Sequence, residues 1–585
     1  MEQQRLHKRQ RRQPQPPSQQ QQQKQQQPGA EPDATNHDPS RVWLPEVVHH
    51  FSRFLGGNEL ACTLRLVNKA TAAQFRGPQH TTIRLSVLVP YHAFAWRWGG
   101  TDATRNLTVR QRKQLPCLTA RSGSIANLEV LLARLDLTSP LDAAVLEAAV
   151  SAGQLEVCRW LRQQGCPWGR LVLHAAAKAG HKAVCEWLLD EGRVVDDWTA
   201  AAAARGGHVS LMDWLLARTA VIQELNHVCR LLEAVAASCD LPTLQRLHHT
   251  YLDSRGEELP GHVREQVLAA AASSPTADWR DKVEWLEGRG YPRSDLACEE
   301  AAARDDGRDR LGWLQQRGYP ISADVACEAA EHGNVGALEF LLAQGVQLSE
   351  GAAHNVAYGA AYGGHLAALK VLHAHGALVT HLAVTAAAEA AANGHLPVVM
   401  WLVETLGTAM ELKAGVYVDA ARSGSWELQV WLHQHGCPWN ASAFQSAAIA
   451  GSEEQLEWLV EHGCPMGDNG QPYLRALENA DLAVLRCLRR LGCPWGPAGR
   501  IFNSAVEACG RTAPGVCAPM LRKQQLLALT WLVEQGCPVD WAEAERQVKR
   551  RGDDEVAAWV VECLEWLAMP VTNAGGGLPV EYPGT

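Results

Sequence analysis

Residues 141–169 read LDAAVLEAAVSAGQLEVCRWLRQQGCPWG and contain one complete copy of the unit that decides the fold. The first half is rich in alanine, and Ala144, Ala148 and Ala149 predict a helix with one small face. A neighbouring helix can approach such a face closely. Gly153 predicts the end of this helix, because glycine adopts the left-handed conformation that follows a helix C-terminus.

The second half of the unit predicts another helix. Gly165 predicts its end, and Pro167 prevents it from continuing, since proline lacks the N–H that a helix interior needs. The phrase Gly-Cys-Pro-Trp at this end returns in later copies around Cys437, Cys464, Cys493 and Cys537 with small changes. The apolar stripe of the second helix contains Leu155, Cys158, Trp160 and Leu161.

The dipeptide Trp-Leu marks how often the unit recurs. Neighbouring copies are mostly 27–30 residues apart, and the wide gaps close when substituted copies such as Phe340-Leu341 are counted. This gives about fourteen stacked helix pairs, each too small to bury its apolar face alone. The first residues of the dipeptides, which we expect in the core of the repeats, are Trp160, Trp187, Trp214, Trp285, Trp313, Trp401, Trp431, Trp458 and Trp531, followed by Trp566.

Residues 118–568 resemble the ankyrin-repeat family. The residues that carry the resemblance are the Gly-His pairs at the start of second helices, with two alanines shortly before them. The resemblance implies a scaffold that binds protein partners and has no catalytic residues or cofactor. The four pairs are Gly180-His181, Gly207-His208, Gly364-His365 and Gly394-His395.

The repeats depart from the family in length. Ankyrin repeats have 33 residues, whereas many units here have 27. The missing residues fall between Gly165 and His174, where ankyrin repeats carry a β-hairpin finger, and the Thr-Pro-Leu-His signature is absent. The units are similar to the short ankyrin-like arrays of algae and amoebae. We therefore expect an all-α solenoid with shortened or missing fingers, forming an arc on the order of 100 Å long.

Composition, cysteine spacing and the lack of catalytic motifs argue against several functions. Beyond residue 40, Asp and Glu outnumber Lys and Arg by 59 to 48, which disfavours broad binding of nucleic acid. The 17 cysteines include no Cys-x-x-Cys pair, so we expect free thiols and no metal site. No hydrolase, metalloprotease or phosphate-loop motif occurs. We expect no catalytic, metal-binding or cofactor-binding residues and no membrane span.

Residues 41–77 form a separate helical segment before the array. It resembles an F-box, which opens with Leu-Pro and ends with Arg-Leu-Val, here Leu44-Pro45 and Arg65–Val67. The resemblance implies docking on the adaptor subunit of an SCF-type ubiquitin ligase. The alternative is a cap for the first repeat, which every solenoid needs. We expect Asn58 to cap the second helix of the segment. The candidate docking residues are Leu44, Pro45, Val47, Phe51, Leu55, Leu60, Leu64 and Val67, and Phe54 lies on the same predicted stripe.

The remaining segments complete the organisation. Residues 1–40 are rich in Gln and Pro and 569–585 in Gly and Pro, so both predict disordered tails. Residues 78–117 connect the head to the array. The basic run Lys8–Arg12 is similar to a short nuclear-import signal. We expect a monomer in the cytoplasm, with import into the nucleus as an open alternative.

Two functions follow from this organisation. The first is a non-catalytic scaffold that binds a protein partner along the array. The second is a substrate receptor of an SCF-type ubiquitin ligase, in which residues 41–77 recruit the adaptor. An RNA-binding solenoid is a weaker third alternative, because the body is acidic and no basic stripe with interleaved aromatics occurs.

Overall fold

The computed structural model describes residues 43–134, 141–218, 224–406, 412–479, 481–509 and 527–551, and within them it contains helices and turns but no strand. The predicted all-α repeat solenoid is therefore confirmed, and no described connection forms a β-hairpin. Both predicted tails, the basic run Lys8–Arg12, Trp566 and the end of the predicted array lie outside the described residues.

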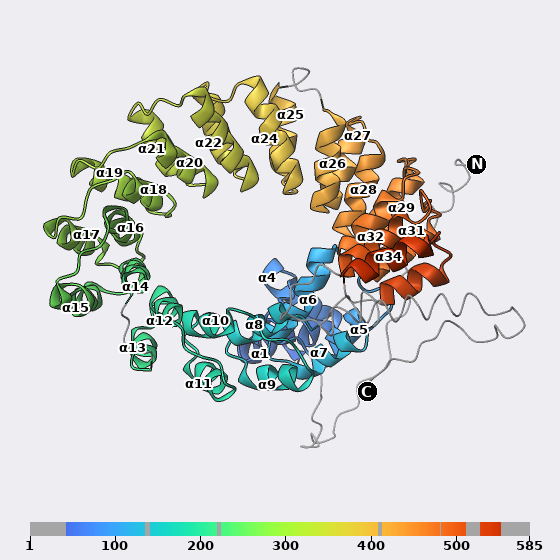
Figure 1. Ribbon diagram of the computed structural model, residues 1–585, viewed down its shortest axis with the longest axis horizontal. Coiled ribbons are helices and arrows are strands. Elements are labelled where there is room, and N and C mark those ends of the chain that lie inside the picture. Colours follow the sequence, from blue (N-terminus) through green and yellow to red (C-terminus); the bar gives the residue numbers. More distant parts are fainter. Residues whose placement is uncertain are drawn as a thin grey trace, which may run out of the picture.

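After the head, helices alternate between an inner and an outer layer (Figure 1). The inner helices are α6 (Val109–Arg121), α8 (Ala143–Ser151), α10 (Val172–Lys178), α12 (Asp197–Arg205), α14 (Leu225–Ser238), α16 (Gly261–Ala272), α18 (Leu296–Ala302), α20 (Ala323–Glu331), α22 (Glu350–Tyr362), α24 (Thr380–Ala392), α26 (Ala414–Ser423), α28 (Ala441–Ala450), α30 (Gln471–Glu478) and α32 (Arg500–Cys509). The outer helices are α7 (Ile125–Leu132), α9 (Leu155–Gln163), α11 (Lys182–Asp190), α13 (Val209–Leu216), α15 (Leu241–Tyr251), α17 (Trp279–Gly288), α19 (Gly307–Gln316), α21 (Val335–Ala343), α23 (Leu366–Ala374), α25 (Leu396–Leu406), α27 (Trp426–Gln434), α29 (Glu453–Glu461) and α31 (Leu482–Arg490), and α34 (Trp541–Arg551) ends the described chain.

Alanine pairs hold the inner helices together. Consecutive inner helices pack on one another more extensively than consecutive outer helices do. Nine of the inner helices have two adjacent buried alanines near their end. These side chains have no methylene groups to keep the neighbouring backbone away, so the helices approach closely. The buried pairs are Ala176-Ala177, Ala203-Ala204, Ala271-Ala272, Ala301-Ala302, Ala329-Ala330, Ala360-Ala361, Ala390-Ala391, Ala420-Ala421 and Ala447-Ala448.

Tryptophans separate the outer helices. The tryptophan of a Gly-Cys-Pro-Trp loop packs on the Trp-Leu tryptophan of the next repeat: the ring centroids of Trp168 and Trp187 are 5.8 Å apart, and those of Trp439 and Trp458 are 6.0 Å apart. Tighter packing between inner helices than between outer helices turns successive repeats in the same direction, so the array curves with its alanine-rich helices on the inside.

Polar side chains join many of the repeats to the previous one. The last carbonyls of a helix have no partner within that helix, and a side chain at or near the start of the next repeat's outer helix binds them. His181 Nε2 lies 3.2 Å from the Ser151 carbonyl oxygen and His395 Nε2 lies 2.8 Å from that of Tyr362, so these two histidines have a structural role. Six other side chains donate an equivalent hydrogen bond to a backbone carbonyl oxygen: Gln154 to Arg121, Lys282 to Ala236, Arg310 to Ala272, Asn334 to Ala302, Gln455 to Ala421 and Asn479 to Ile449.

The curvature closes the array into a ring, instead of the open arc that we expected (Figure 1). The chain around α6 meets α28, α29 and α31, although more than 330 residues separate these segments. The Arg112 guanidinium donates 2.7 Å to the Gly451 carbonyl and forms an ion pair with Asp481. Both side chains are buried, 6% and 2% exposed. Burial raises the pKa of Asp481 against the opposing charge of Arg112.

A second set of contacts lies beside this pair. Arg105 binds both oxygens of Glu457 at 2.5 and 2.7 Å, and its carbonyl accepts the Glu453 N–H at 3.0 Å. Arg490 binds the carboxylates of Glu453 at 3.0 Å and Glu457 at 2.6 Å. The approach is close enough to need glycine: a Cβ at Gly451, where φ is +80°, would lie 2.2 Å from Val109 Cγ2. We call these contacts the ring closure.

The predicted head contains α1 (Pro45–Ser52), α2 (Gly57–Cys62), the 3-10 turn η2 (Leu64–Leu66) and α3 (Lys69–Gln74), and the predicted connecting segment contains α4 (Pro78–Thr81) and α5 (Tyr91–Trp98). The two pack together, so residues 43–98 are called the head from here on. One small core contains Val48, Leu60, Leu64 and Phe75. A second core, which includes Cys62 of α2 and Phe94 of α5, packs on α6 and α7. The head therefore covers the first helix pair of the array. The predicted boundary at 118 falls inside α6.

Two expectations about the head are wrong. Asn58 lies inside α2, which Gly56 caps instead. The Asn58 amide donates to the carbonyls of Arg84 at 2.8 Å and Val87 at 3.0 Å, so it holds the loop before α5. The apolar stripe of α1 is shifted by one residue: Val48 is buried, whereas Val47 and Phe54 are exposed.

None of the described helices has the length and apolar character needed to cross a membrane.

Replacing Arg112 with alanine tests the ring closure. The change leaves the buried Asp481 carboxylate unpaired, which costs about 3–5 kcal/mol. Repeats fold through contacts with their neighbours, so we expect the helices to persist while the ring opens. Small-angle scattering should show a larger radius of gyration with unchanged helical circular dichroism. Arg159→Ala, which removes the exposed pair with Glu156 on α9, is the control. Unchanged scattering of Arg112→Ala would contradict the closure.

Candidate interaction surface

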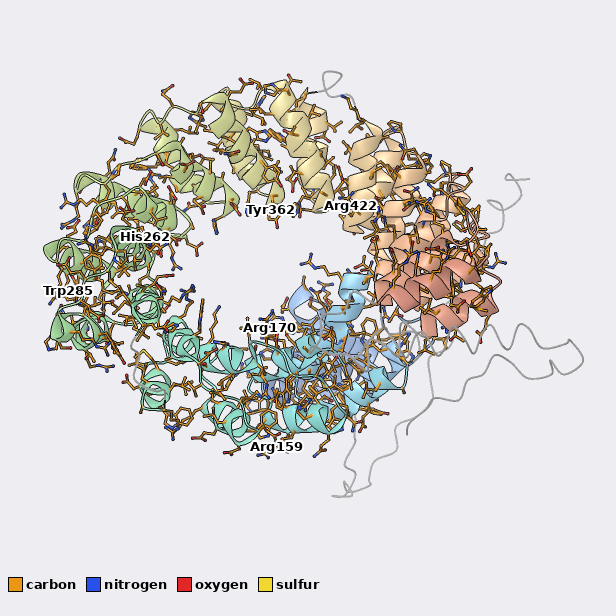
Figure 2. All side chains as sticks on the ribbon, in the orientation of Figure 1. Arg159, Arg170, His262, Trp285, Tyr362 and Arg422 are labelled. Carbon is orange, nitrogen blue, oxygen red and sulfur yellow. The ribbon has the colours of Figure 1, made fainter. Side chains whose placement is uncertain are left out.

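The exposed faces of the inner helices form the wall of the ring, which we call the inner wall. The described side chains leave a central opening, and Arg170, Tyr362 and Arg422 point toward it, whereas Arg159 and Trp285 lie on the outside (Figure 2). In the inner helices that have a buried alanine pair, the pair fixes which positions face the opening. At α10 these are Leu171, directly before the helix, His174 and Lys178, and on α12 they are Trp198, Ala201, Ala202 and Arg205.

Three adjoining cavities over α10–α18 make a continuous groove in this wall, which we call the inner groove. Their volumes are about 650, 580 and 320 Å³. The largest has an apolar floor of Ala201 and Ala202 between α10 and α12. The two ends of the inner groove differ in character: the side chains are aliphatic and aromatic at α10 and α12, and polar and acidic at α16 and α18. The principal residues that line the groove are Leu171, Lys178, Trp198, Arg205, Arg230, Glu233, His262, Gln266 and Glu300.

The apolar end of the groove holds two large exposed side chains. Leu171 is 61% exposed and Trp198 is 45% exposed. The Arg230 guanidinium lies over the Trp198 ring, 3.5 Å from its centroid, so the indole is held in one orientation by a cation–π contact. Arg205 binds Glu233 at 2.8 Å. His174 Nε2 lies 2.9 Å from Asp196, whose carboxylate also caps α12.

The next part of the inner wall is acidic. Burial, together with the charges of Asp295 and Asp324, raises the pKa of Glu299 on α18. Burial and Glu331 raise the pKa of Glu328 on α20, opposed by His332. The inner wall therefore changes from cations at α10–α14 to carboxylates at α18–α20. The carboxylates of this acidic wall are Asp295, Glu299, Glu300, Asp324, Glu328 and Glu331.

The predicted core tryptophans lie on the outer side of the ring and not at the inner wall. Trp187 and Trp531 are buried, and the other seven are partly buried against the core. The leucine that follows each of them is fully buried. Burying such a leucine stabilises the fold by about 1.5–3 kcal/mol.

The loop cysteines fill corners of the core. Cys437, Cys464, Cys493 and Cys537 are buried, and all described cysteines are free. Burial raises the pKa of Cys464, Cys493 and Cys537 to about 12. A thiol whose pKa lies this high stays protonated and unreactive at neutral pH.

The candidate docking residues of the head are not on one surface. Leu44, Val47 and Val67 are exposed, Phe51 and Leu55 are half-buried, and Leu60 and Leu64 are buried in the head's own core. Leu60 and Leu64 therefore cannot contact a partner while the head is folded. Pro45 is exposed as the first residue of α1.

One part of the chain matches a known family. Residues 146–226 match ankyrin repeats, in three copies. The match spans α8 to the start of α14 and includes the apolar end of the inner groove. Ankyrin repeats indicate a protein-interaction scaffold. Among curated proteins there is no match.

Solved structures give a weak likeness to another family of helical repeats. A pentatricopeptide repeat protein, PPR10, in complex with an 18-nt psaJ RNA element is 13% identical over 91% of this chain and 85% of that chain, with a TM-score of 0.24. PPR10 from maize is 12% identical over 90% of this chain and 96% of that chain, with a TM-score of 0.20. At these scores the comparison supports no transfer of the RNA to this chain.

Sequence reasoning missed the inner groove. The signal was available: Leu171 and Trp198 each stand five residues before an alanine pair, in equivalent positions of repeats 27 residues apart. The Trp-Leu dipeptide, the strongest repeated signal, lies on the outer helices, where tryptophan has a packing role. Only the alternation of inner and outer helices shows which positions face the opening.

Replacing Glu328 with glutamine tests whether the raised pKa of this carboxyl in the acidic wall lowers stability. A carboxyl whose pKa is raised in the folded state binds its proton more tightly there than in the unfolded chain, so it lowers stability once both forms are ionised. We therefore expect Glu328→Gln to raise the melting temperature at pH 7. The gain should shrink as pH falls toward 4, where the carboxyl is protonated in both states.

Glu339→Gln, the same change on the exposed face of the outer helix α21, is the matched control and should alter the melting temperature by less than about 1 °C. A Glu328→Gln variant with no gain at pH 7, or with a gain that is the same at both pH values, would contradict this account of the acidic wall.

Proposed function

We propose that this chain is a non-catalytic scaffold that binds a protein partner along its inner wall. The observation that carries the proposal is the set of large apolar side chains that the inner helices expose toward the opening. Leu171, Trp198, Tyr358 and Tyr362 are each between 45% and 61% exposed. Exposing such side chains in water has no stabilising effect on the ring itself, whereas aromatic side chains on a protein surface are enriched at interfaces.

The arrangement of the repeats supports the same proposal. Most inner helices use an alanine pair for packing, and the positions that face the opening vary in chemistry, from Trp198 to Asp324 to Tyr362. A partner that follows the wall therefore meets a different set of groups at every repeat. Solenoids present extended concave surfaces of this kind to their partners. An intracellular, reducing setting belongs to the proposal, because the described cysteines are free.

Affinity capture with matched variants tests the proposal. The tagged full-length protein is used as bait in an extract of its own cells, beside an inner variant with Trp198→Ala, Tyr358→Ala and Tyr362→Ala. An outer variant with Trp426→Ala, Arg159→Ala and Glu339→Ala is the control. We expect specific proteins to be recovered with the wild type and the outer variant and to be reduced at least tenfold with the inner variant. If the inner variant still recovers these proteins and the outer variant does not, the proposal is contradicted.

A second function, adaptor docking by the head, is favoured by a separate observation. The head exposes Leu44, Val47, Phe54, Leu66 and Val67, and Phe54 is 81% exposed. Capping the array requires none of these five side chains, because the contacts to α6 and α7 come from residues such as Cys62 and Phe94. In this function the head would recruit an SCF-type adaptor, and the inner wall would select the ligase substrate.

Binding to the purified SCF adaptor subunit tests the second function. We expect Leu44→Ala, Val47→Ala and Val67→Ala together to weaken binding at least tenfold while the melting temperature stays unchanged, because all three side chains are exposed. Leu60→Ala is unsuitable, since it creates a cavity in the head's core. Failure of the folded wild-type protein to bind the adaptor would assign the head to capping alone.

A further inference from the structure

The inner groove holds cations that form no ion pair with a described carboxylate. Lys178 and Arg230 line its apolar end, and Arg170, next to Leu171 in the chain, points toward the central opening (Figure 2). Among the described residues none of the three forms an ion pair, whereas Arg205 is paired with Glu233. The carboxylate of Asp196, which caps α12, also lies in this cavity. The apolar end therefore carries a net positive charge, from Lys178, Arg205 and Arg230 against Asp196 and Glu233, in a chain that is acidic overall.

These cations surround an apolar pocket. Leu171 and Trp198 form its two sides, and Ala201 and Ala202 form its floor. Alanines at these two positions leave the space that a larger side chain would fill. The cavity of about 650 Å³ exceeds the volume of a single leucine, phenylalanine or tryptophan side chain.

We propose that the inner groove binds an extended peptide segment of a partner, with one large apolar side chain inserted between Leu171 and Trp198 and acidic residues on either side of it. The apolar side chain displaces water from the alanine floor and stacks on the indole. The flanking carboxylates meet Lys178, Arg230 and Arg170. This inference rests on the proposed function and names the chemistry of the partner.

The acidic wall sets the position of such a segment. Glu299, Glu300 and Glu328 follow the groove on α18 and α20 and repel carboxylates. An acidic segment shifted by two or three repeats loses its cations and meets like charges, which repel it. The apolar anchor is consequently held at α10–α14. Single-stranded RNA also uses aromatic side chains and cations, but its phosphates recur along the whole strand and would meet Glu299, Glu300 and Glu328 next to the cations.

Fluorescence anisotropy with synthetic peptides tests the inference. The probes are twelve-residue peptides with a central leucine or tryptophan, flanked by glutamates in one set and by lysines in the other, added to the full-length protein at physiological salt. We expect the glutamate set to bind at least tenfold more tightly than the lysine set. Trp198→Ala should weaken this binding at least tenfold and Trp198→Phe by less than about threefold, since phenylalanine keeps an aromatic face.

Charge reversal supplies the matched pair of variants. Lys178→Glu with Arg230→Glu should invert the preference, so that the lysine peptides bind more tightly. Arg159→Glu with Lys182→Glu makes the same change of charge on the outer helices α9 and α11 and should leave both affinities within about twofold.

Several results would overturn the inference: no binding of the glutamate peptides below 1 mM, equal affinity for both sets, equal weakening by the outer charge reversal, or displacement of the glutamate peptides by a single-stranded RNA of twelve nucleotides at lower concentration. Binding that survives Trp198→Ala would place the peptides elsewhere. None of these results contradicts the scaffold proposal if the inner variant still recovers less partner protein than the wild type in affinity capture. The two proposals can therefore be rejected independently.

Discussion

The close contact between alanine pairs on consecutive inner helices is the interaction on which the rest of the structure depends. Adding methylene groups at such positions would overpack the interface, at a cost of about 1–3 kcal/mol per site. With alanine there, the inner helices pack closely, and tryptophans lie between outer helices in the repeats that carry them. The tighter packing on the inner side recurs along the array, which therefore curves in one direction with its alanine-rich helices inward.

The curvature brings together two segments that are distant in sequence, and specific side chains then hold them. Arg112 reaches Asp481 and the carbonyl of Gly451, and Arg105 shares two glutamates with Arg490. Gly451 leaves room for Val109. Closure gives the inner wall its enclosed form, so that a partner bound there is surrounded by repeats with different surface chemistry.

The helix pairs could be predicted from the sequence because their signals are local. Gly153 and Gly165, predicted as helix ends, have φ values of +71° and +79°. The ring closure could not be predicted, since a small turn per repeat accumulates over the array and 369 residues separate Arg112 from Asp481. The stripe of α1 was displaced by one residue because Val47 and Val48 are equally apolar. Leu171 and Trp198 look like core residues until the neighbouring helices show that they face the opening.

Electron cryomicroscopy of the wild-type protein tests the central claim most directly. If alanine pairs and tryptophans curve the array as described, class averages at physiological salt will show a closed ring with a central opening and with the chain around α6 in contact with α28. Averages dominated by an open arc, with α6 separated from the C-terminal repeats, would contradict the account.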